Sequence, residues 1–216
     1  MRIKILPTFN IEDGLLLPDD ALIAGVDEVG RGSLAGPVMA AAIILDRSKC
    51  WGDQLDQVDD SKRLSKKKRE TISAWIYKVS NVGIGVVDRE EIDQLNILWA
   101  SLLAMERAID VVQKNLSRPL DAVLIDGNRL PNLNCRGYAI VQGDKKSFSI
   151  AAASIVAKIA RDKFMFKMAK THPRYGWEKN MGYGTRYHME ALKKYGVTDQ
   201  HRRSFRPVAE TLESWS

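Results

Sequence analysis

The 216-residue chain lacks the features of a secreted or membrane protein. Its longest unbroken apolar run, residues 38–45, is far shorter than the roughly 20 residues that a membrane-spanning helix needs. The first residues carry basic side chains, but no long apolar region or small-residue cleavage site follows them, which argues against a secretory leader. The two cysteines, Cys50 and Cys135, lie far apart and outside any CxxC pair. We therefore expect a cytoplasmic protein with two free thiols.

Motifs for several common chemistries are also missing. The three histidines, His172, His188 and His201, do not have the spacing of metal ligands. No G-x-S-x-G nucleophile elbow occurs. The glycine-rich segment 25–36 does not match two common loop motifs. It departs from the phosphate-binding loop because arginine replaces the required lysine, and it departs from the dinucleotide-binding loop because a strand-like segment follows it instead of a helix.

Acidic residues are scarce in only one part of the chain. Residues 1–135 contain 17 Lys and Arg against 20 Asp and Glu, whereas residues 136–216 contain 16 against 7. The first part therefore has a net charge of −3 and the second a net charge of +9, which together give the total of +6. A basic C-terminal third indicates contact with a polyanion such as nucleic acid. A solvated, lysine-rich helix face would show the same charge, so charge alone does not separate the two interpretations.

Apolar periodicity predicts a mixed α/β domain. Strands are expected at 22–29, 38–45, 82–87, 122–125 and 138–141, and helices at 66–79, 97–116 and 149–169. Ser65 is expected to cap the first of these helices. Residues 1–20 are interpreted as a loose lead-in, and short helices are expected from His172 onward. Strands that alternate with helices in this order place the chain in the α/β class.

Two adjacent carboxylates, Asp27 and Glu28, interrupt the first apolar strand. Burying two carboxylates together is costly unless a cation neutralises them. Neighbouring side chains of a strand point to opposite faces, so both can serve one site only if the strand bends, which Gly30 and Gly32 allow. An exposed pair on an edge strand is the alternative. The apolar strand that follows at once favours a central position instead.

Further carboxylates end two later strands. Asp126 and Asp144 each stand where a strand gives way to a turn, and each alone is typical of an ordinary turn residue. Together with Asp27 and Glu28 they form a set of hard oxygen ligands, which select Mg²⁺ or Mn²⁺. Two such ions beside a basic surface suit phosphodiester hydrolysis. Asp162 lies four residues after Lys158, and a helix ion pair accounts for it.

Eight short motifs, in order along the chain, resemble those of bacterial type 2 ribonuclease H (ribonuclease HII). The most specific is the block DEVGRGSLAGPV at 27–38. The others are DSK at 60–62, IDGN at 125–128, GDK at 143–145, AASIVAK at 152–158, RD at 161–162, GYGT at 182–185 and HRRSF at 201–205. The resemblance runs from about residue 23 to residue 207 and leaves an N-terminal extension of about 20 residues outside it.

The resemblance implies a ribonuclease H-like fold: a mixed five-stranded sheet flanked by helices, with a small helical C-terminal appendage. The implied divisions are an extension at 1–20, a catalytic domain at 21–170 and an appendage at 171–216 that contacts the duplex. The implied activity is endonucleolytic cleavage of the RNA strand of RNA/DNA hybrids, including single ribonucleotides embedded in duplex DNA. The cut would fall on the 5′ side of the ribonucleotide and leave 3′-hydroxyl and 5′-phosphate ends. These nucleic acids are the expected partners. The protein itself is expected to be a monomer.

The resemblance also assigns roles to individual residues. The catalytic and metal-binding carboxylates of the family, which would hold two Mn²⁺ or Mg²⁺ ions, fall on Asp27, Glu28, Asp126 and Asp144. Its substrate-binding positions fall on Gly30, Arg31, Gly32, Ser61, Lys62 and Tyr183. The Gly-Arg-Gly group would read the 2′-hydroxyl, the Ser-Lys pair would contact phosphate, and the tyrosine would pack on the deoxyribose after the ribonucleotide.

Two choices stay open. Asp162 is taken as a helix ion pair or an outer residue of the site, and Asp144 rather than Asp162 is taken as the fourth ligand. Ser154, Lys158 and Arg161 share one helix face by spacing, and we expect that face to be solvated.

Two rival functions remain. A DNA-only nuclease of the same fold, such as a junction resolvase or a transposase-like enzyme, would need the carboxylates but no reader of the 2′-hydroxyl. A non-catalytic nucleic-acid-binding module could keep the basic C-terminal third without any carboxylate cluster.

Overall fold

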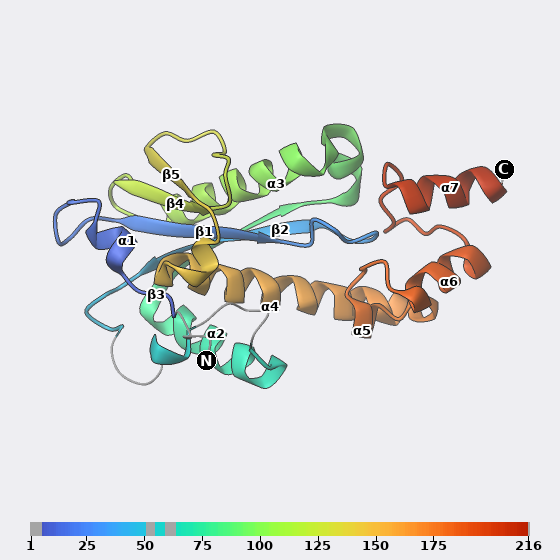
Figure 1. Cartoon of the computed structure of the whole chain (residues 1–216), viewed down its shortest axis with the longest axis horizontal. Coiled ribbons are helices and arrows are strands. Elements are labelled where there is room, and N and C mark those ends of the chain that lie inside the picture. Colours follow the sequence, from blue (N-terminus) through green and yellow to red (C-terminus); the bar gives the residue numbers. More distant parts are fainter. Residues whose placement is uncertain (1–5, 51–54, 59–63, 216) are drawn as a thin grey trace, which may run out of the picture.

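The fold is built around a central β-sheet. The computed structural model describes residues 6–50, 55–58 and 64–215. Its strands are β1 (Ile23–Val29), β2 (Val38–Leu45), β3 (Ser80–Val87), β4 (Ala122–Asp126) and β5 (Arg136–Ile140). They form one mixed sheet in the order β3-β2-β1-β4-β5 (Figure 1). The pairs β3–β2 and β2–β1 are antiparallel, and the pairs β1–β4 and β4–β5 are parallel. The predicted five-stranded mixed sheet is thereby confirmed.

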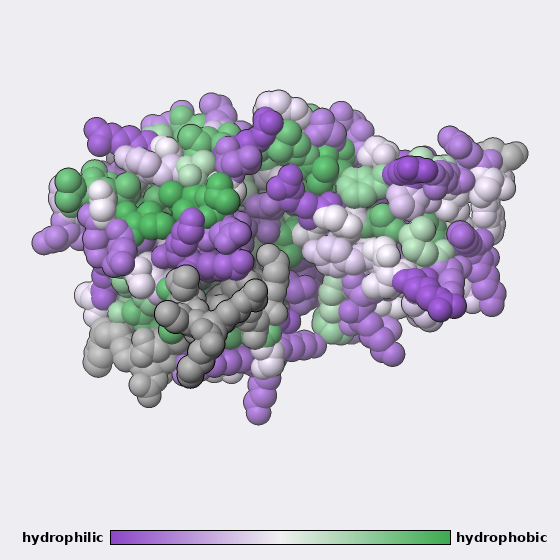
Figure 2. Space-filling view, in the orientation of Figure 1, coloured by the Kyte–Doolittle hydropathy of each residue, from purple (hydrophilic) through white to green (hydrophobic). Residues whose placement is uncertain are grey.

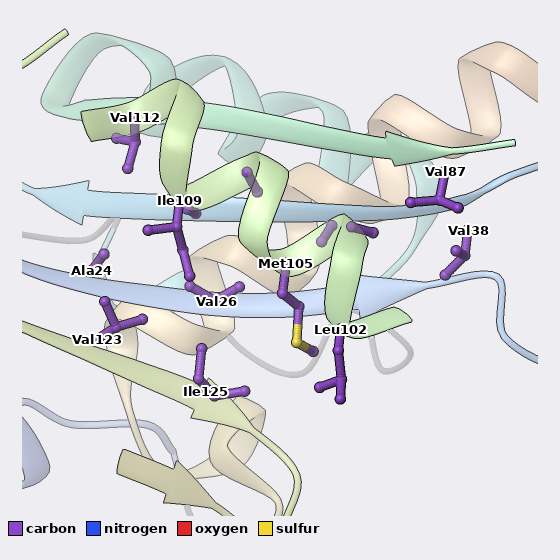
Figure 3. Close-up of a cluster of buried hydrophobic side chains, with 14 of the residues drawn as sticks. Ala24, Val26, Val38, Val87, Leu102, Met105, Ile109, Val112, Val123 and Ile125 are labelled. Carbon is purple, nitrogen blue, oxygen red and sulfur yellow. The ribbon is translucent and has the colours of Figure 1, made fainter. Parts of the chain in front are cut away.

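Helices cover both faces of this sheet. One face packs against α3 (Arg89–Lys114), and the other packs against α2 (Lys66–Val79) and α4 (Phe148–Thr171). Figure 3 shows α3 side chains such as Met105 and Ile109 directed at Val26 and Ile125 of the central strands. Alternate residues of β2 enter the two cores, with Ala42 on the α3 side. A strand buried on both faces reads as one continuous apolar run, which is the pattern that predicted β2.

The C-terminal helices form a unit beyond one end of the sheet (Figure 1). They are α5 (Trp177–Asn180), α6 (Arg186–Tyr195) and α7 (Arg206–Trp215), preceded by the 3₁₀ turn η3 (Pro173–Tyr175). Small apolar clusters around Trp177 and Leu192 attach this unit to the far end of α4 and to the loop after β1. Figure 2 shows that hydrophilic residues dominate its surface on the face in view, whereas hydrophobic residues gather around α1 (Asn10–Asp13) and the loop after it.

Two other 3₁₀ turns complete the described elements. They are η1 (Leu55–Gln57), before α2, and η2 (Gly143–Lys145), between β5 and α4. The Ser65 side chain accepts a hydrogen bond from the Lys68 N–H, so the predicted cap of α2 is confirmed.

The predicted helix at 97–116 begins earlier than expected, at Arg89. Asp88 and Glu91 form a capping box there, in which each side chain accepts a hydrogen bond from the other residue's backbone. Asn96 then interrupts the helix with φ of 66°, and its side chain accepts the N–H of Leu98. The apolar stripe that guided the prediction starts only after this interruption, because the first segment is mainly polar.

The expectation of a loose lead-in is wrong for residues 8–13. These residues pack on the start of α4, where the Phe9 and Phe148 rings lie 5.0 Å apart. Glu12 of α1 is buried there. Sequence periodicity could not reveal this, because α1 is a single turn.

Both cysteines are free, as predicted. Burial raises the pKa of the Cys50 thiol to about 11, so this thiol stays protonated and unreactive at neutral pH. No helix in the described part of the chain combines the length and apolar character needed to cross a bilayer.

Candidate active site

Parallel pairing of β1 with β4 brings acidic residues together from distant parts of the chain. Val26 of β1 lies opposite Ile125 of β4, and each is followed directly by an aspartate. Because the carboxyl ends of parallel strands meet at one edge of a sheet, Asp27 and Asp126 lie at the same edge. Glu28 follows on β1, so three of the four predicted carboxylates lie on two adjacent central strands.

The electrostatics of this edge are unfavourable for a cation-free protein. The pKa of Asp27 is raised well above its ordinary value by burial first, and then by the negative charges of Glu28 and Asp126. Hydrogen bonds from Ser154 and from the Glu28 N–H (2.7 Å) oppose the rise only in part. Burial also raises the pKa of Glu28, against the lowering effect of Arg31. Such carboxylates gain stability in their charged form when a cation comes near.

The fourth predicted carboxylate lies on a turn that contacts the third. Asp144 belongs to η2 and is 5% exposed. The preceding residue, Gly143, donates its N–H to Asp126 Oδ1 at 2.6 Å. Asp162 instead forms its predicted ion pair with Lys158, with Nζ and Oδ1 2.7 Å apart.

The carboxylates do not form a preassembled cage. Among the described residues, no group of three His, Cys, Asp or Glu side chains lies close enough to hold a metal ion as it stands. Like charges repel, and Glu28 Oε1 is drawn to Arg31 Nη1 at 3.2 Å. The donor chemistry nevertheless fits a hard divalent cation, because buried carboxylate oxygens with raised pKa values are the groups that such an ion stabilises.

A small cavity of about 50 Å³ opens beside these side chains. Its charged lining comes from Glu28, Asp126, Arg31 and Arg129. Its apolar wall comes from α3 and comprises Leu98, Leu102 and Met105. The acidic edge therefore borders an opening in which carboxylates and arginines face the same space.

The loop between β1 and β2 lies against Tyr183. Ser33 and Tyr183 form an isolated antiparallel bridge, and the Leu34 N–H donates to Gly182 O at 2.8 Å. A Cβ at Gly32 would have the Tyr183 ring as its nearest neighbour, at 3.9 Å. The structure thus brings together two of the predicted substrate-binding positions, Gly32 and Tyr183. The predicted phosphate contacts, Ser61 and Lys62, lie outside the described residues.

The Arg161 side chain connects the loop between β1 and β2 with the segment that carries Tyr183. Its guanidinium is fully buried and donates to Pro37 O, to Ser33 Oγ and to Met181 O, at 2.8–2.9 Å. The expectation of a solvated face is therefore wrong for Arg161, and also for Ser154, which is buried against Asp27. No local sequence signal marks Arg161 as buried, because the charged residues Asp162 and Lys163 follow it directly.

Arg202 supports the same loop from the C-terminal unit. It donates to Gly36 O and to Arg31 O, both at 2.9 Å, and is fully buried. Burial and the nearby charge of Arg161 lower the pKa of Arg202 to about 9, so the Arg202 side chain remains positive at neutral pH. Two buried guanidinium groups therefore lie beneath the glycine-rich loop.

A histidine pair holds the backbone of Tyr183. His188 Nδ1 donates to Tyr183 O at 3.0 Å, so His188 Nε2 is left as the acceptor for Trp177 Nε1–H (3.0 Å) and for His201 Nε2–H (3.1 Å). His201 Nδ1 accepts the Thr198 N–H, which places the His201 hydrogen on Nε2. Both rings must be neutral to satisfy this network.

The network predicts a loss of stability in mild acid. Burial lowers the pKa of His201 to about 3, whereas the unfolded chain titrates near 6.5. The stabilising effect of a neutral His201 is thus present above pH 6.5 and is lost as pH falls toward 3. Between pH 7 and pH 5 the loss is about 2 kcal/mol in the free energy of unfolding. Urea unfolding at both pH values should show it, and a His201→Asn variant should show a shallower decline; parallel declines would contradict the assignment.

Comparison with known proteins gives the relationships of the chain. The ribonuclease HII family profile matches residues 24–208. The ribonuclease HII of Paramagnetospirillum magneticum is 50% identical over 191 residues, which cover 88% of this chain and 93% of that protein. The ribonuclease HII of Magnetococcus marinus is 50% identical over 210 residues, which cover 95% of each.

Solved structures share the fold at lower identity. Ribonuclease H2 from Pyrococcus horikoshii OT3 has a TM-score of 0.70 and 23% identity, over 89% of this chain and 98% of that chain. Bst-RNase HIII in complex with Mn²⁺ has a TM-score of 0.74 and 18% identity, over 90% of this chain and 70% of that chain.

The mixed five-stranded sheet flanked by helices places the chain in the class of ribonuclease H-like folds. Within this class the chain belongs to the ribonuclease HII family, as its motifs predicted. Members of this family cleave the RNA of RNA/DNA hybrids and depend on divalent metal ions.

Proposed function

We propose that the chain cleaves at ribonucleotides in RNA/DNA hybrids and at single ribonucleotides embedded in duplex DNA, on the 5′ side of the ribonucleotide. The observation that supports this most is the position of the Gly30–Gly32 turn between the acidic edge and Tyr183. A nuclease that acts on DNA alone has no need for a backbone loop next to its carboxylates and an aromatic ring. We also propose that the enzyme acts as a monomer in the cytoplasm.

Asp27, Glu28, Asp126 and Asp144 would hold two Mn²⁺ or Mg²⁺ ions. When bound, such ions supply Lewis acidity for the attack of water on the phosphodiester and for the departure of the 3′-oxygen. The chain's own residues orient the ligands: Ser154 hydrogen bonds to Asp27, and Gly143 hydrogen bonds to Asp126. The expected products have 3′-hydroxyl and 5′-phosphate ends.

Recognition of the ribose would come from the loop. Gly32 has open space where a side chain would project, so its backbone can approach a sugar closely. A 2′-hydroxyl donates and accepts hydrogen bonds, and it is the group that separates RNA from DNA. Tyr183, 37% exposed, would pack on the deoxyribose that follows the ribonucleotide.

The basic C-terminal third would hold the duplex. Residues 136–216 carry a net charge of +9, and within them the helices after α4 project beyond one end of the sheet (Figure 1). Phosphate contacts of this kind weaken as salt rises. Ser61 and Lys62 are proposed as additional phosphate contacts on the strength of the family motif alone.

One substrate panel separates this proposal from its rivals. The panel contains a long RNA/DNA hybrid, a DNA duplex with one ribonucleotide and the same duplex without it, each incubated with Mn²⁺ and then with EDTA. We expect cleavage of the first two substrates only, and none in EDTA. Equal cutting of the all-DNA duplex would favour a resolvase-like enzyme. Normal binding without cleavage in any divalent metal would favour a binding module.

A further inference from the structure

The N-terminal segment 8–13 lies outside the family match, yet it contacts the turn that carries Asp144. Its Thr8 N–H donates to Lys146 O, and the Phe148 N–H donates to Thr8 O, both at 3.1 Å. These bonds bracket Ser147, the residue at the start of α4. The Phe9 ring packs on Phe148, and Figure 1 shows α1 beside the beginning of α4.

Glu12 makes the central contact of this segment. Its side chain is 3% exposed, and Oε1 accepts hydrogen bonds from Ser147 Oγ at 2.7 Å and from the Ser149 N–H at 3.3 Å. Ser147 Oγ in turn accepts the Ile150 N–H and caps α4. A helix N-terminus favours a carboxylate through its free N–H groups and its dipole. Glu12 therefore completes the cap of α4 from a separate part of the chain.

The cap continues into the active site. The N–H groups of Lys146 and Ser147 both donate to Gly143 O at 2.9 Å, which closes the turn around Asp144. Gly143 donates its own N–H to Asp126. Consecutive hydrogen bonds therefore connect Glu12, through Ser147 and the turn η2, to the Asp126 carboxylate.

The same turn contains backbone strain. Gln142, immediately before η2, has φ of 56° and ψ of 43°, a left-handed conformation that a non-glycine residue adopts at an energetic cost. Such a conformation persists only where the surrounding structure holds it in place. The contacts of segment 8–13 with residues 146–149 are one source of that restraint.

We propose that Glu12 is a positioning residue that fixes η2, and with it Asp144, for binding of the divalent ion. The inference rests on the proposed function, since it takes Asp144 as a ligand of that ion. Groups that orient metal ligands typically change metal affinity by about 10- to 100-fold when they are removed. Glu12 would then contribute to the chemistry of the site although it precedes residues 24–208, which the family profile matches.

Hydrogen exchange tests the positioning step without any metal or substrate. In full-length Glu12→Ala, the amides of residues 143–149 should exchange about tenfold faster than in the wild type. Asp13→Ala is the matched control, because Asp13 lies on the same helix but is exposed and pairs with Arg47. It should leave those amides unchanged. Wild-type exchange in Glu12→Ala would overturn the proposal. Glu12→Leu replaces Glu12→Ala if the latter does not fold, because it also removes the hydrogen bonds to Ser147 and Ser149 but leaves the Ser147 cap of α4 in place.

Manganese affinity tests the consequence. Titration with Mn²⁺, followed by the electron paramagnetic resonance of the free ion, should show about tenfold weaker binding in Glu12→Ala. Glu12→Gln, whose amide oxygen can still accept from Ser147, should restore most of the affinity. Faster exchange with wild-type Mn²⁺ affinity would overturn the proposal and leave Glu12 a stabiliser of the fold. Asp144→Asn separates the proposed role of Asp144 from that of Glu12. Wild-type Mn²⁺ affinity in this variant would contradict the role of Asp144 as a ligand, whereas hydrogen exchange in Glu12→Ala would still test whether Glu12 fixes the turn.

Discussion

Asp27→Asn is expected to abolish cleavage, by at least about 1,000-fold, while duplex binding stays largely intact. Asp27 is buried among negative charges, and its carboxylate is the central acidic group of the proposed metal site. The amide has nearly the same shape but lacks the charge that attracts a divalent ion. Single-turnover cleavage and a filter-binding assay on the same ribonucleotide-containing duplex measure both quantities.

The same variant should be more stable than the wild type when no metal is present. A carboxylate with a raised pKa in the folded state destabilises that state as pH rises above the unfolded value near 3.8, so the cost is present at neutral pH. Each kcal/mol relieved should raise the melting temperature by roughly 2–4 °C. The difference should shrink near pH 4 and reverse in saturating Mn²⁺, which stabilises only a protein that binds it.

Asp110→Asn provides the control, because Asp110 is an exposed aspartate of α3 away from the acidic edge. It should change neither cleavage nor the melting temperature. Substantial cleavage by Asp27→Asn would remove Asp27 from the metal site. A metal-free Asp27→Asn less stable than the wild type would contradict the electrostatic account of this edge.

Gly32→Ala is expected to lower cleavage at a single embedded ribonucleotide by about 100-fold without destabilising the protein. The added methyl group has space in the protein, since its nearest neighbour, the Tyr183 ring, is 3.9 Å away. That space is where we place the ribose, so the methyl group would displace the sugar, and a displacement of about 1 Å can cost 100-fold in rate. Thermal unfolding and cleavage kinetics on the same preparation test both parts.

Gly30→Ala is the informative contrast. Gly30 has φ of +95°, and a Cβ there would lie 2.1 Å from Nε of the buried Arg161. This variant should lose stability as well as activity, because Arg161 would have to leave the carbonyls that it holds. Wild-type activity of Gly32→Ala would show that the backbone of Gly32 does not approach the substrate.

The sheet and the acidic edge could be predicted because their signals are local. A continuous apolar run marks β2, which is buried on both faces, and a carboxylate directly after an apolar run marks Asp27 within β1 and Asp126 at the end of β4. The motif around Asp27 was specific enough to indicate the family that the comparisons confirm.

Other parts of the site depend on contacts between distant residues. Arg161 reaches carbonyls at Pro37 and Met181, and no periodicity distinguishes a buried arginine that bonds to backbone from one that faces water. Glu12 lies in a one-turn helix that forms by packing on Ser147, far away in the sequence. Predicted roles for Asp144, Arg31 and Tyr183 remain predictions, since they concern contacts with ions and nucleic acid.

The position and chemistry of the cut test the central claim most directly. A DNA duplex with one ribonucleotide, labelled at each end in turn, is incubated with the wild-type protein in Mn²⁺, and the products are sized and treated with phosphatase and with ligase. The account predicts a single cut on the 5′ side of the ribonucleotide, 3′-hydroxyl and 5′-phosphate ends, and no product in EDTA. A cut on the 3′ side that persists in EDTA and leaves a 2′,3′-cyclic phosphate would contradict it.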